Sequence, residues 1–222
     1  MNEILEQIAV CIEFGKVNKM APYPPNMKDQ DGADELTKQA LENGISAKSI
    51  LDEALVAGME KVGQKFAEKK IFIPQMLMSA KAMNAAIEHL KPFFKKGEIE
   101  QKGKFILATV QGDLHDIGKN LVKMAIEGSG WEVIDLGVDV KADKIIDTLK
   151  SNPDALVGLS ALLTTTMGNM QNTVEILKQE FPETKILVGG APVTDDFREK
   201  IGADFYSPDP QGAVSYLKEQ VV

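Results

Sequence analysis

Apolar residues in the first part of the chain recur at helical spacing, three to four residues apart, and no run there has the alternation of a strand. Pro74 stands at a position that suits the first turn of a helix. We therefore expect a helical bundle in residues 1–96. The expected helices cover residues 2–16, 33–43, 47–69 and 74–94.

From Lys104 onward the pattern changes to short apolar runs that alternate with amphipathic segments. Repeated strand and helix units of this length favour right-handed crossovers and a parallel sheet covered by helices on both faces. Five strands predict an α/β domain of the flavodoxin-like (Rossmann-like) type with strand order 2-1-3-4-5. The expected strands cover residues 104–110, 132–136, 155–159, 185–188 and 204–206, and the expected helices cover 117–128, 142–150, 166–180, 195–200 and 211–221.

Two segments interrupt the periodic pattern. Residues 97–103 are charged and flanked by glycines, so they predict a linker between a helical domain of residues 1–96 and a sheet domain of residues 104–222. Residues 21–32 contain three prolines and an Asp-Gly pair, which exclude regular structure. We expect an ordered surface connection there, and the presence of Tyr23 among the prolines leaves a docking or gating role open.

Candidate chemistry gathers where the first expected strand ends, in residues 112–118 (Gly-Asp-Leu-His-Asp-Ile-Gly). His115 stands just before a helix start, with Asp113 two residues earlier. A carboxylate on one ring nitrogen fixes the tautomer of an imidazole and leaves the other nitrogen for a metal. The pattern is weak by itself, because His115 could close a loop and Asp116 could cap the following helix.

Two further strand ends carry small or polar residues. Residues 155–162 end in Ser-Ala-Leu, with Ser160 at the strand end, and residues 186–190 end in a glycine pair. Ligands of open parallel sheets bind at the carboxyl ends of the strands, at the point where the strand order reverses. That point lies between the first and third strands in the expected order, so His115 and Ser160 should border one crevice.

Together, the D-x-H-x-x-G pattern, the Ser-x-Leu strand end and the glycine pair resemble the cobalamin-binding module of methionine synthase, of the corrinoid mutases and of the corrinoid proteins of anaerobic methyltransferase systems. The resemblance covers about residues 33–222, and its best match is the small two-domain corrinoid proteins. It implies a cobalamin or related corrinoid cofactor whose cobalt takes His115 as its lower axial ligand. Asp113 would then hydrogen-bond the other ring nitrogen, and Ser160 would support this relay or the nucleotide tail.

The resemblance also implies a set of residues around the cofactor. The glycine pair would let the nucleotide tail lie against backbone, or it would only permit a tight turn. The threonines after the third strand would offer hydroxyls to the tail or the corrin, although Thr165 or Thr166 could instead cap the next helix. The implied catalytic residues are Asp113, His115 and Ser160, and the implied cofactor-binding residues are Gly112, Asp113, Leu114, His115, Asp116, Ile117, Gly118, Ser160, Leu162, Thr164, Thr165, Gly189 and Gly190.

The helical half has its own resemblance, to the cap domain that covers the methyl face of the corrin in these proteins. It rests on residues 62–66 and 71–83, and Phe72, Met76 and Met83 are the candidates for the cover. The two methionines belong to one helical stripe, which in most helices is bundle core. The expected architecture is therefore an N-terminal four-helix cap bundle followed by the sheet domain.

Composition and charge narrow the function classes. The formal net charge of −8 and the pI of about 4.9 disfavour binding to nucleic acid and to anionic membrane surfaces. The chain starts with acidic residues where a secretory signal carries basic ones, and no apolar run approaches membrane-spanning length, so we expect a cytoplasmic protein. Cys11 is expected to be buried and inert, and His89 is expected to complement the end of its helix dipole. These residues supply too few ligands for a zinc site.

The resemblance implies a methyl carrier rather than an enzyme that turns over alone. A substrate-specific methyltransferase would methylate cobalt(I) on this protein, and a second methyltransferase would pass the methyl group to tetrahydrofolate or a similar acceptor. A reductive activator would restore cobalt(I). The chain would thus be a corrinoid subunit of a multi-component methyltransferase, and its proline-rich segment tilts the expected donor toward an O-demethylase or betaine system.

Two other functions compete with the methyl carrier. A cobalamin-dependent sensor or regulatory binding module would use the same cofactor, but such proteins normally append a DNA-binding or signalling segment, and none is evident in the sequence. A phosphoryl receiver domain shares the five-stranded sheet, but it needs an aspartate where this chain has Ser160.

Overall fold

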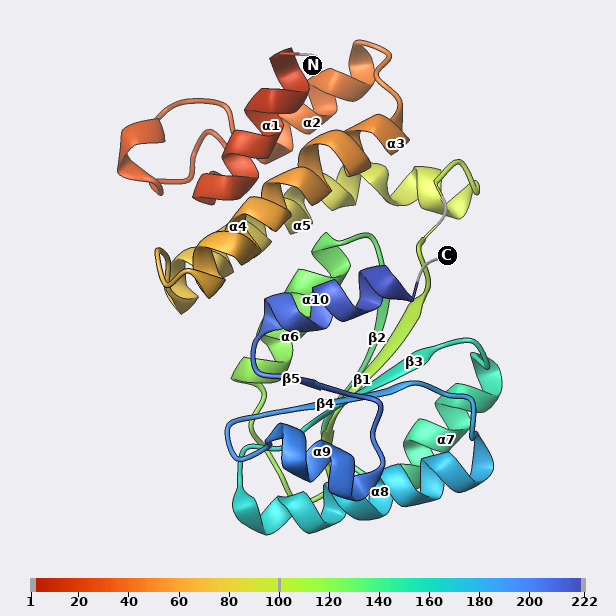
Figure 1. Ribbon diagram of the computed structural model, residues 1–222. Helices are drawn as coiled ribbons and strands as arrows, with labels where there is room; N and C mark the ends of the chain where they lie inside the picture. The colour runs from red at the N-terminus through yellow and green to blue at the C-terminus, as the bar shows by residue number, and fades with distance from the viewer. Residues whose placement is uncertain (1–2, 100, 221–222) are drawn as a thin grey trace. The chain divides into compact units, whose positions relative to one another are not determined.

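A computed structural model describes residues 3–99 and 101–220 of the chain (Figure 1). The chain divides into two compact units, a helical one of residues 1–101 and 128–130 and an α/β one of residues 102–127 and 131–222. This division falls within residues 97–103, of which Glu100 lies outside the described residues. The linker role of this segment stays a prediction.

The helical unit contains the four expected helical stretches. The third stretch is continuous but has a π-helical segment at its centre, which sequence periodicity did not indicate. Its start is capped by Ser46, whose hydroxyl oxygen accepts a hydrogen bond from the Ser49 amide at 3.0 Å. The elements are α1 (Glu3–Phe14), η1 (Pro25–Met27), α2 (Ala33–Glu42), α3 (Ala47–Ser49), the π-helical η2 (Ile50–Val56), α4 (Ala57–Ala67) and α5 (Ile73–Lys95).

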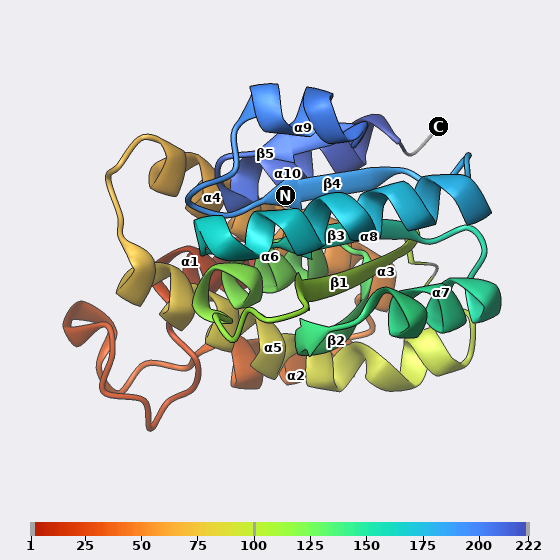
Figure 2. The same cartoon turned by 90° about the horizontal axis from the view of Figure 1, so that it is seen from below.

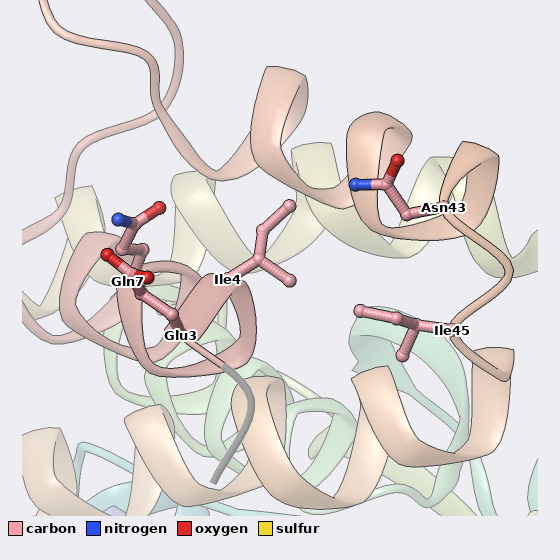
Figure 3. Close-up of a pocket in the computed structure, with 5 residues that line it drawn as sticks. All are labelled: Glu3, Ile4, Gln7, Asn43 and Ile45. Carbon is pink, nitrogen blue, oxygen red and sulfur yellow. The ribbon is translucent and has the colours of Figure 1, made fainter.

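A pocket in this unit is lined by residues of α1 and of the connection after α2 (Figure 3). Its lining consists of Glu3, Ile4, Gln7, Asn43 and Ile45. None of these residues belongs to the motifs that the sequence singled out.

Among residues 3–99 and 101–220, no helix combines the length and the apolar character that crossing a bilayer requires.

The α/β unit is a five-stranded parallel sheet in the order β2-β1-β3-β4-β5, which confirms the expected fold class. Helices α7, α8 and α9 cover one face of the sheet, and α6 and α10 cover the other (Figures 1 and 2). The elements are β1 (Lys104–Val110), α6 (Ile117–Gly128), β2 (Glu132–Val140), α7 (Ala142–Ser151), β3 (Leu156–Ser160), η3 (Thr164–Thr166), α8 (Met167–Glu180), β4 (Ile186–Gly189), α9 (Asp195–Ile201), β5 (Phe205–Ser207) and α10 (Pro210–Glu219).

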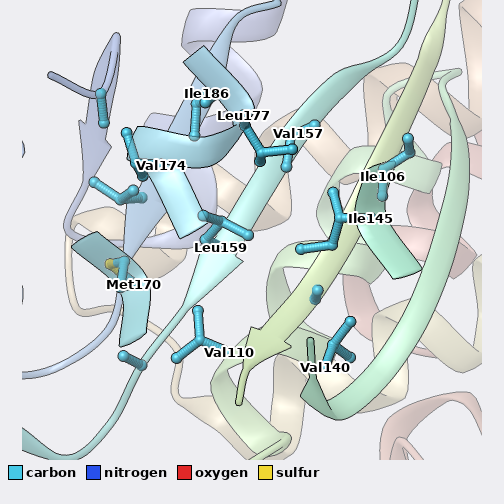
Figure 4. Packing of buried hydrophobic residues seen from close by; sticks show 14 of the residues in the cluster. Ile106, Val110, Val140, Ile145, Val157, Leu159, Met170, Val174, Leu177 and Ile186 are labelled. Atoms are coloured by element: carbon cyan, nitrogen blue, oxygen red, sulfur yellow. The ribbon is translucent and has the colours of Figure 1, made fainter. Parts of the chain in front are cut away.

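The core of this unit lies between the central strands and helices α7 and α8 (Figure 4). Ile106, Val157 and Ile186 project from β1, β3 and β4, and they pack with Ile145 from α7 and Leu177 from α8. All five side chains are fully buried. Burial of this apolar face is what fixes the register of the strands, and therefore which residues emerge together at their carboxyl ends.

Strand β2 is longer than the sequence pattern indicated, because it contains two irregularities beside β1. The Cα pairing passes from Leu107 and Asp135 to Ala108 and Gly137, and then to Val110 and Val140. Each step inserts an extra residue into β2, as in a β-bulge. The expected strand ended at residue 136, so the alternation rule missed the bulged continuation through residue 140.

Candidate functional site

The loop between β1 and α6 holds Asp113 and His115 against each other. The His115 Nδ1 atom lies 2.8 Å from the Asp113 Oδ1 atom, and the His115 amide also donates to that oxygen at 3.1 Å. Asp113 is fully buried, whereas 49% of the His115 side chain is exposed. The loop therefore buries the carboxylate and leaves the imidazole on the surface, with Nε2 free of this contact.

The second carboxylate oxygen of Asp113 reaches the segment that follows β3. Asp113 Oδ2 accepts hydrogen bonds from the Leu162 amide at 2.7 Å and from the Leu163 amide at 3.2 Å. The Thr166 hydroxyl lies 2.8 Å from the same oxygen and 2.9 Å from the Leu163 carbonyl. One buried carboxylate thus joins the ends of two neighbouring strands, β1 and β3.

These hydrogen bonds keep Asp113 charged. Burial raises the pKa of the Asp113 carboxyl, but the bonds from the Leu162 amide, from the His115 amide and ring, and from the Thr166 hydroxyl outweigh burial. They hold the pKa of Asp113 well below its usual range. A proton shared between Asp113 and the imidazole therefore resides on Nδ1 of His115, which leaves the lone pair of Nε2 for another partner.

The hydroxyl that contacts Asp113 belongs to Thr166, whereas the sequence offered Ser160 as support for the relay or for the nucleotide tail. Ser160 lies at the end of β3, where it pairs with Thr109 of β1 and Gly189 of β4. Among the described residues, it is Thr166, six positions further along, that reaches the carboxylate. The structure thus adds Thr166 as a hydroxyl partner of Asp113, and the support of the relay or of a nucleotide tail by Ser160 stays a prediction.

The sequence offered Thr166 as a hydroxyl for the cofactor or as a helix cap, and it did not indicate the contact with Asp113. The signal that could have found this contact is the turn before α8. The η3 turn carries Thr166 back toward the strand end, and its side chain makes no capping hydrogen bond to α8. Thr164 and Thr165 are exposed on the same turn. Their implied contacts with a cofactor stay predictions.

Large apolar side chains lie exposed beside His115 in the chain and on the segment bonded to Asp113. Leu114 and Ile117 flank the imidazole in sequence, and they are 72% and 67% exposed. Leu162 and Leu163, whose amides bind Asp113, are also exposed. Because folded proteins rarely leave such side chains together in water, this group indicates a surface that receives an apolar partner.

Two further side chains hold the loop from β1 and α8. The buried Thr109 donates its hydroxyl to the His115 carbonyl at 2.9 Å. The Asn169 side-chain amide donates to the Gln111 carbonyl at 2.8 Å. The backbone on either side of Asp113 is therefore fixed to the sheet domain.

The surroundings of the predicted glycines differ from one glycine to the next. A Cβ on Gly190 would lie 1.8 Å from the Ala161 carbonyl oxygen, and its φ is +125°, so close packing of the β3 and β4 ends already requires glycine there. A Cβ on Gly189 would lie 3.0 Å from the Ser207 carbonyl oxygen. Gly118 adjoins open space, which excludes crowding within the chain as its reason. The implied role of Gly118 in cofactor binding stays a prediction.

The remaining predicted residues lie apart from these contacts. Asp116 is exposed, and its side chain accepts a hydrogen bond from Asn120 at 3.1 Å. In the helical unit, Phe72 is exposed, while Met76 and Met83 are almost fully buried. Of the three candidates for the cover, only Phe72 presents its side chain to solvent, and the cover role of the set stays a prediction.

The sequence suggested that His89 complements the dipole at the end of its helix. The structure shows that it also contacts a residue of another helix. Its Nε2 atom lies 2.6 Å from Asp34 Oδ1, so α5 and α2 are joined by this pair.

Among the described residues, no three His, Cys, Asp or Glu side chains gather as a metal site. His115 therefore offers one nitrogen donor, which fits a metal whose other ligands come from a flat cofactor, and the apolar side chains beside it fit the face of such a ring.

Two family models match the chain, and together they cover most of it. A B12 binding domain model matches residues 103–214, and a second B12 binding domain model matches residues 28–91. The first includes the whole loop of Asp113 and His115, and the second includes the helices from α2 to most of α5.

Characterised relatives and solved structures are similar over nearly the whole chain. The trimethylamine corrinoid protein of Methanosarcina barkeri is 38% identical over 194 residues, which are 86% of this chain and 89% of that protein. The crystal structure of a cobalamin-binding protein from Desulfitobacterium hafniense is 31% identical, with a TM-score of 0.75 and 98% of each chain covered. The crystal structure of the methanol:cobalamin methyltransferase complex MtaBC from Methanosarcina barkeri is 28% identical, with a TM-score of 0.82, and covers 99% of this chain and 80% of that one.

Proposed function

This chain belongs to the corrinoid proteins of methyltransferase systems, and on that premise we propose that it carries a methyl group between two partner enzymes with His115 as the protein ligand of its cofactor. The observation that carries the ligand assignment is the 2.8 Å contact between His115 Nδ1 and Asp113 Oδ1, which leaves Nε2 on an exposed imidazole. The corrinoid, when bound, supplies the cobalt that takes up and gives up the methyl group.

The contribution of Asp113 is to control the proton on the imidazole. Because its pKa is held low, the Asp113 carboxylate accepts the Nδ1 hydrogen bond, so Nε2 keeps its lone pair and would be a strong ligand for the cobalt.

Thr166 and the two amides after β3 fix the orientation of this carboxylate. Three donors converge on Oδ2 of Asp113, so the carboxylate cannot rotate away from His115 without leaving buried donors unpaired. The exposed Leu114, Ile117, Leu162 and Leu163 would contact the bound corrinoid and exclude water around the imidazole.

The partner enzymes that we propose are a substrate-specific methyltransferase, a second methyltransferase that acts on tetrahydrofolate or a similar acceptor, and a reductive activator. The similar structure from Methanosarcina barkeri is that of a methanol:cobalamin methyltransferase complex, which supports a partner of the first kind. We place the choice of methyl donor on that partner enzyme. The expectation of a methoxyaromatic or betaine donor competes with the methylamines and methanol for which the relatives are named.

The ligand assignment is tested with His115→Ala, and His89→Ala is the matched control because His89 is the other histidine of the chain. Each purified protein is loaded with hydroxocobalamin, desalted and reduced to the cobalt(II) state. We expect an imidazole nitrogen splitting in the electron paramagnetic resonance spectrum of the wild type and of His89→Ala, and its loss in His115→Ala. An unchanged splitting in His115→Ala contradicts the assignment, and a colourless wild-type protein contradicts the function.

The donor is tested by reducing the loaded protein to cobalt(I) and adding candidate methyltransferases with their substrates. Methoxyaromatics, glycine betaine, methylamines and methanol are offered in parallel, and the visible spectrum reports conversion to the methylated cofactor. A methoxyaromatic or betaine response supports the expectation from the sequence. A response to a methylamine or methanol alone rejects it.

A further inference from the structure

Asp139 adopts a backbone conformation that is uncommon for a residue other than glycine. Its φ is +53°, in the left-handed region, where aspartate and asparagine are tolerated better than most side chains. It lies inside the second irregularity of β2, where the pairing passes from Ala108 and Gly137 to Val110 and Val140 and β2 has one residue more than β1. Strained conformations of this kind are retained where the surrounding structure uses them.

The bulged segment has its own support, so Asp139 is held in place from the β2 side. Asp135 Oδ1 accepts a hydrogen bond from the Gly137 amide at 2.9 Å. The same oxygen forms an ion pair with the Lys119 Nζ atom at 2.6 Å. The Lys119 side chain is nearly fully buried, so this pair anchors β2 to the helix that follows His115. A bulge beside a functional loop redirects the side chains that come after it.

Asp139 makes two hydrogen bonds to the loop, and both go to the residues just before His115. Its Oδ1 atom accepts from the Gly112 amide at 2.7 Å, and its amide donates to the Asp113 carbonyl at 3.0 Å. The two bonds bracket the Gly112–Asp113 dipeptide, and Gly112 itself has a φ of +82°. The bond to the carboxylate is charge-assisted, which makes it stronger than an ordinary amide bond.

We infer that Asp139 is a positioning residue for the Asp113–His115 pair, because it clamps the Gly112–Asp113 dipeptide from the end of β2. This inference rests on the proposed function of His115. Thr109 and Asn169 hold the carbonyls of His115 and Gln111, whereas Asp139 alone, among the described side chains, bonds the Gly112 amide. Without the clamp, the Asp113 carboxylate can shift relative to the imidazole, and the direction of Nε2 is no longer fixed.

The test separates the carboxylate of Asp139 from its backbone conformation. Asp139→Gly keeps the left-handed backbone and removes the acceptor, and Asp139→Asn keeps an acceptor oxygen and tolerance for positive φ. Asp154→Gly is the matched control, because Asp154 is an exposed turn residue before β3, at the other end of the strands. Amide hydrogen exchange at Gly112 is measured by NMR with and without bound hydroxocobalamin, and the imidazole splitting is measured in the cobalt(II) protein.

In Asp139→Gly we expect Gly112 to exchange about tenfold faster than in the wild type, the factor for loss of a hydrogen bond worth about 1.4 kcal/mol. We also expect a smaller fraction of cobalt(II) with the imidazole splitting. Asp139→Asn should retain most of both properties, and Asp154→Gly should match the wild type. A structural role of Asp139 unrelated to the loop would lower stability without changing this fraction.

Three results overturn the inference. One is an equal Gly112 exchange rate in Asp139→Gly and the wild type, and another is faster exchange with an unchanged imidazole-bound fraction. The third is a fully unprotected Gly112 amide in the wild type, which needs no variant and so remains decisive if Asp139→Gly does not fold. If the wild-type protein lacks the imidazole splitting, the proposed role of His115 is contradicted instead. The positioning role of Asp139 is then tested by the Gly112 exchange rates of the cofactor-free wild type and Asp139→Gly.

Discussion

The Thr166 hydroxyl lies 2.8 Å from the buried Asp113 carboxylate, although the two residues are 53 positions apart in the chain. The contact ties the turn after β3 to the loop after β1, on which His115 is exposed. The imidazole therefore depends on a hydroxyl from another strand end as well as on its own neighbour in sequence.

Replacing Thr166 with valine should remove this hydrogen bond while keeping the side-chain volume. Loss of a hydrogen bond to a buried charge costs about 1 to 3 kcal/mol of unfolding free energy. Urea unfolding at pH 7 measures the cost, and Thr166→Ser should recover most of it. Ser160→Ala is the comparison. An equal loss of unfolding free energy in Thr166→Val and Ser160→Ala would contradict a stabilising hydrogen bond between Thr166 and Asp113.

Gly190→Ala should be far more destabilising than Gly202→Ala. Both glycines have positive φ, but a Cβ on Gly202 meets no atom within 4 Å, whereas a Cβ on Gly190 overlaps the Ala161 carbonyl. The Gly202 variant should therefore lose about 1 to 2 kcal/mol from backbone strain alone. The Gly190 variant should lose about 4 kcal/mol or more, because the ends of β3 and β4 must also separate. Similar unfolding midpoints would contradict the close approach.

Asp204 should make the stability of the protein depend on pH in the acid range. Burial raises the pKa of Asp204, but hydrogen bonds from Lys178 and from the Ile186 amide, with the charge of Lys185, outweigh it and lower the pKa. Because the folded pKa lies below the unfolded value of about 3.9, the charged carboxylate stabilises the fold above that pH, and the contribution is lost as the pH falls through the folded pKa.

Asp204→Asn removes this contribution. The difference in unfolding free energy between the wild type and Asp204→Asn should be constant near pH 6 to 7 and should shrink below about pH 4. The exposed Asp147 provides the control, since Asp147→Asn should show little difference at any pH. A gap for Asp204→Asn that widens toward acid pH would reverse the predicted sign.

Cys11 should be unreactive in the folded protein. It is 2% exposed, and burial raises the pKa of its thiol to about 11, so the nucleophilic thiolate is scarce at neutral pH. A thiol reagent added at pH 8 should label the chain slowly until urea unfolds it, after which labelling should be fast. Rapid labelling under native conditions would show that α1 opens to solvent.

Most of what the sequence determined about this protein is local. The helical and strand periods, the Gly-Asp-Leu-His loop and the pairing of a carboxylate with an imidazole two residues away can be read from neighbouring positions. Parallel crossovers also limit the strand order to few choices, and the expected order was correct.

The tertiary structure alone decided which distant side chains support the pair. Thr166 reaches Asp113 and Asp139 reaches Gly112 only because β2 and β3 lie on either side of β1, and because β2 carries extra residues that no alternation pattern records. Sequence periodicity reports which face of an element is buried. It does not report how far a bulge or a turn carries a hydroxyl or a carboxylate toward another strand, because that depends on contacts between residues remote in the chain.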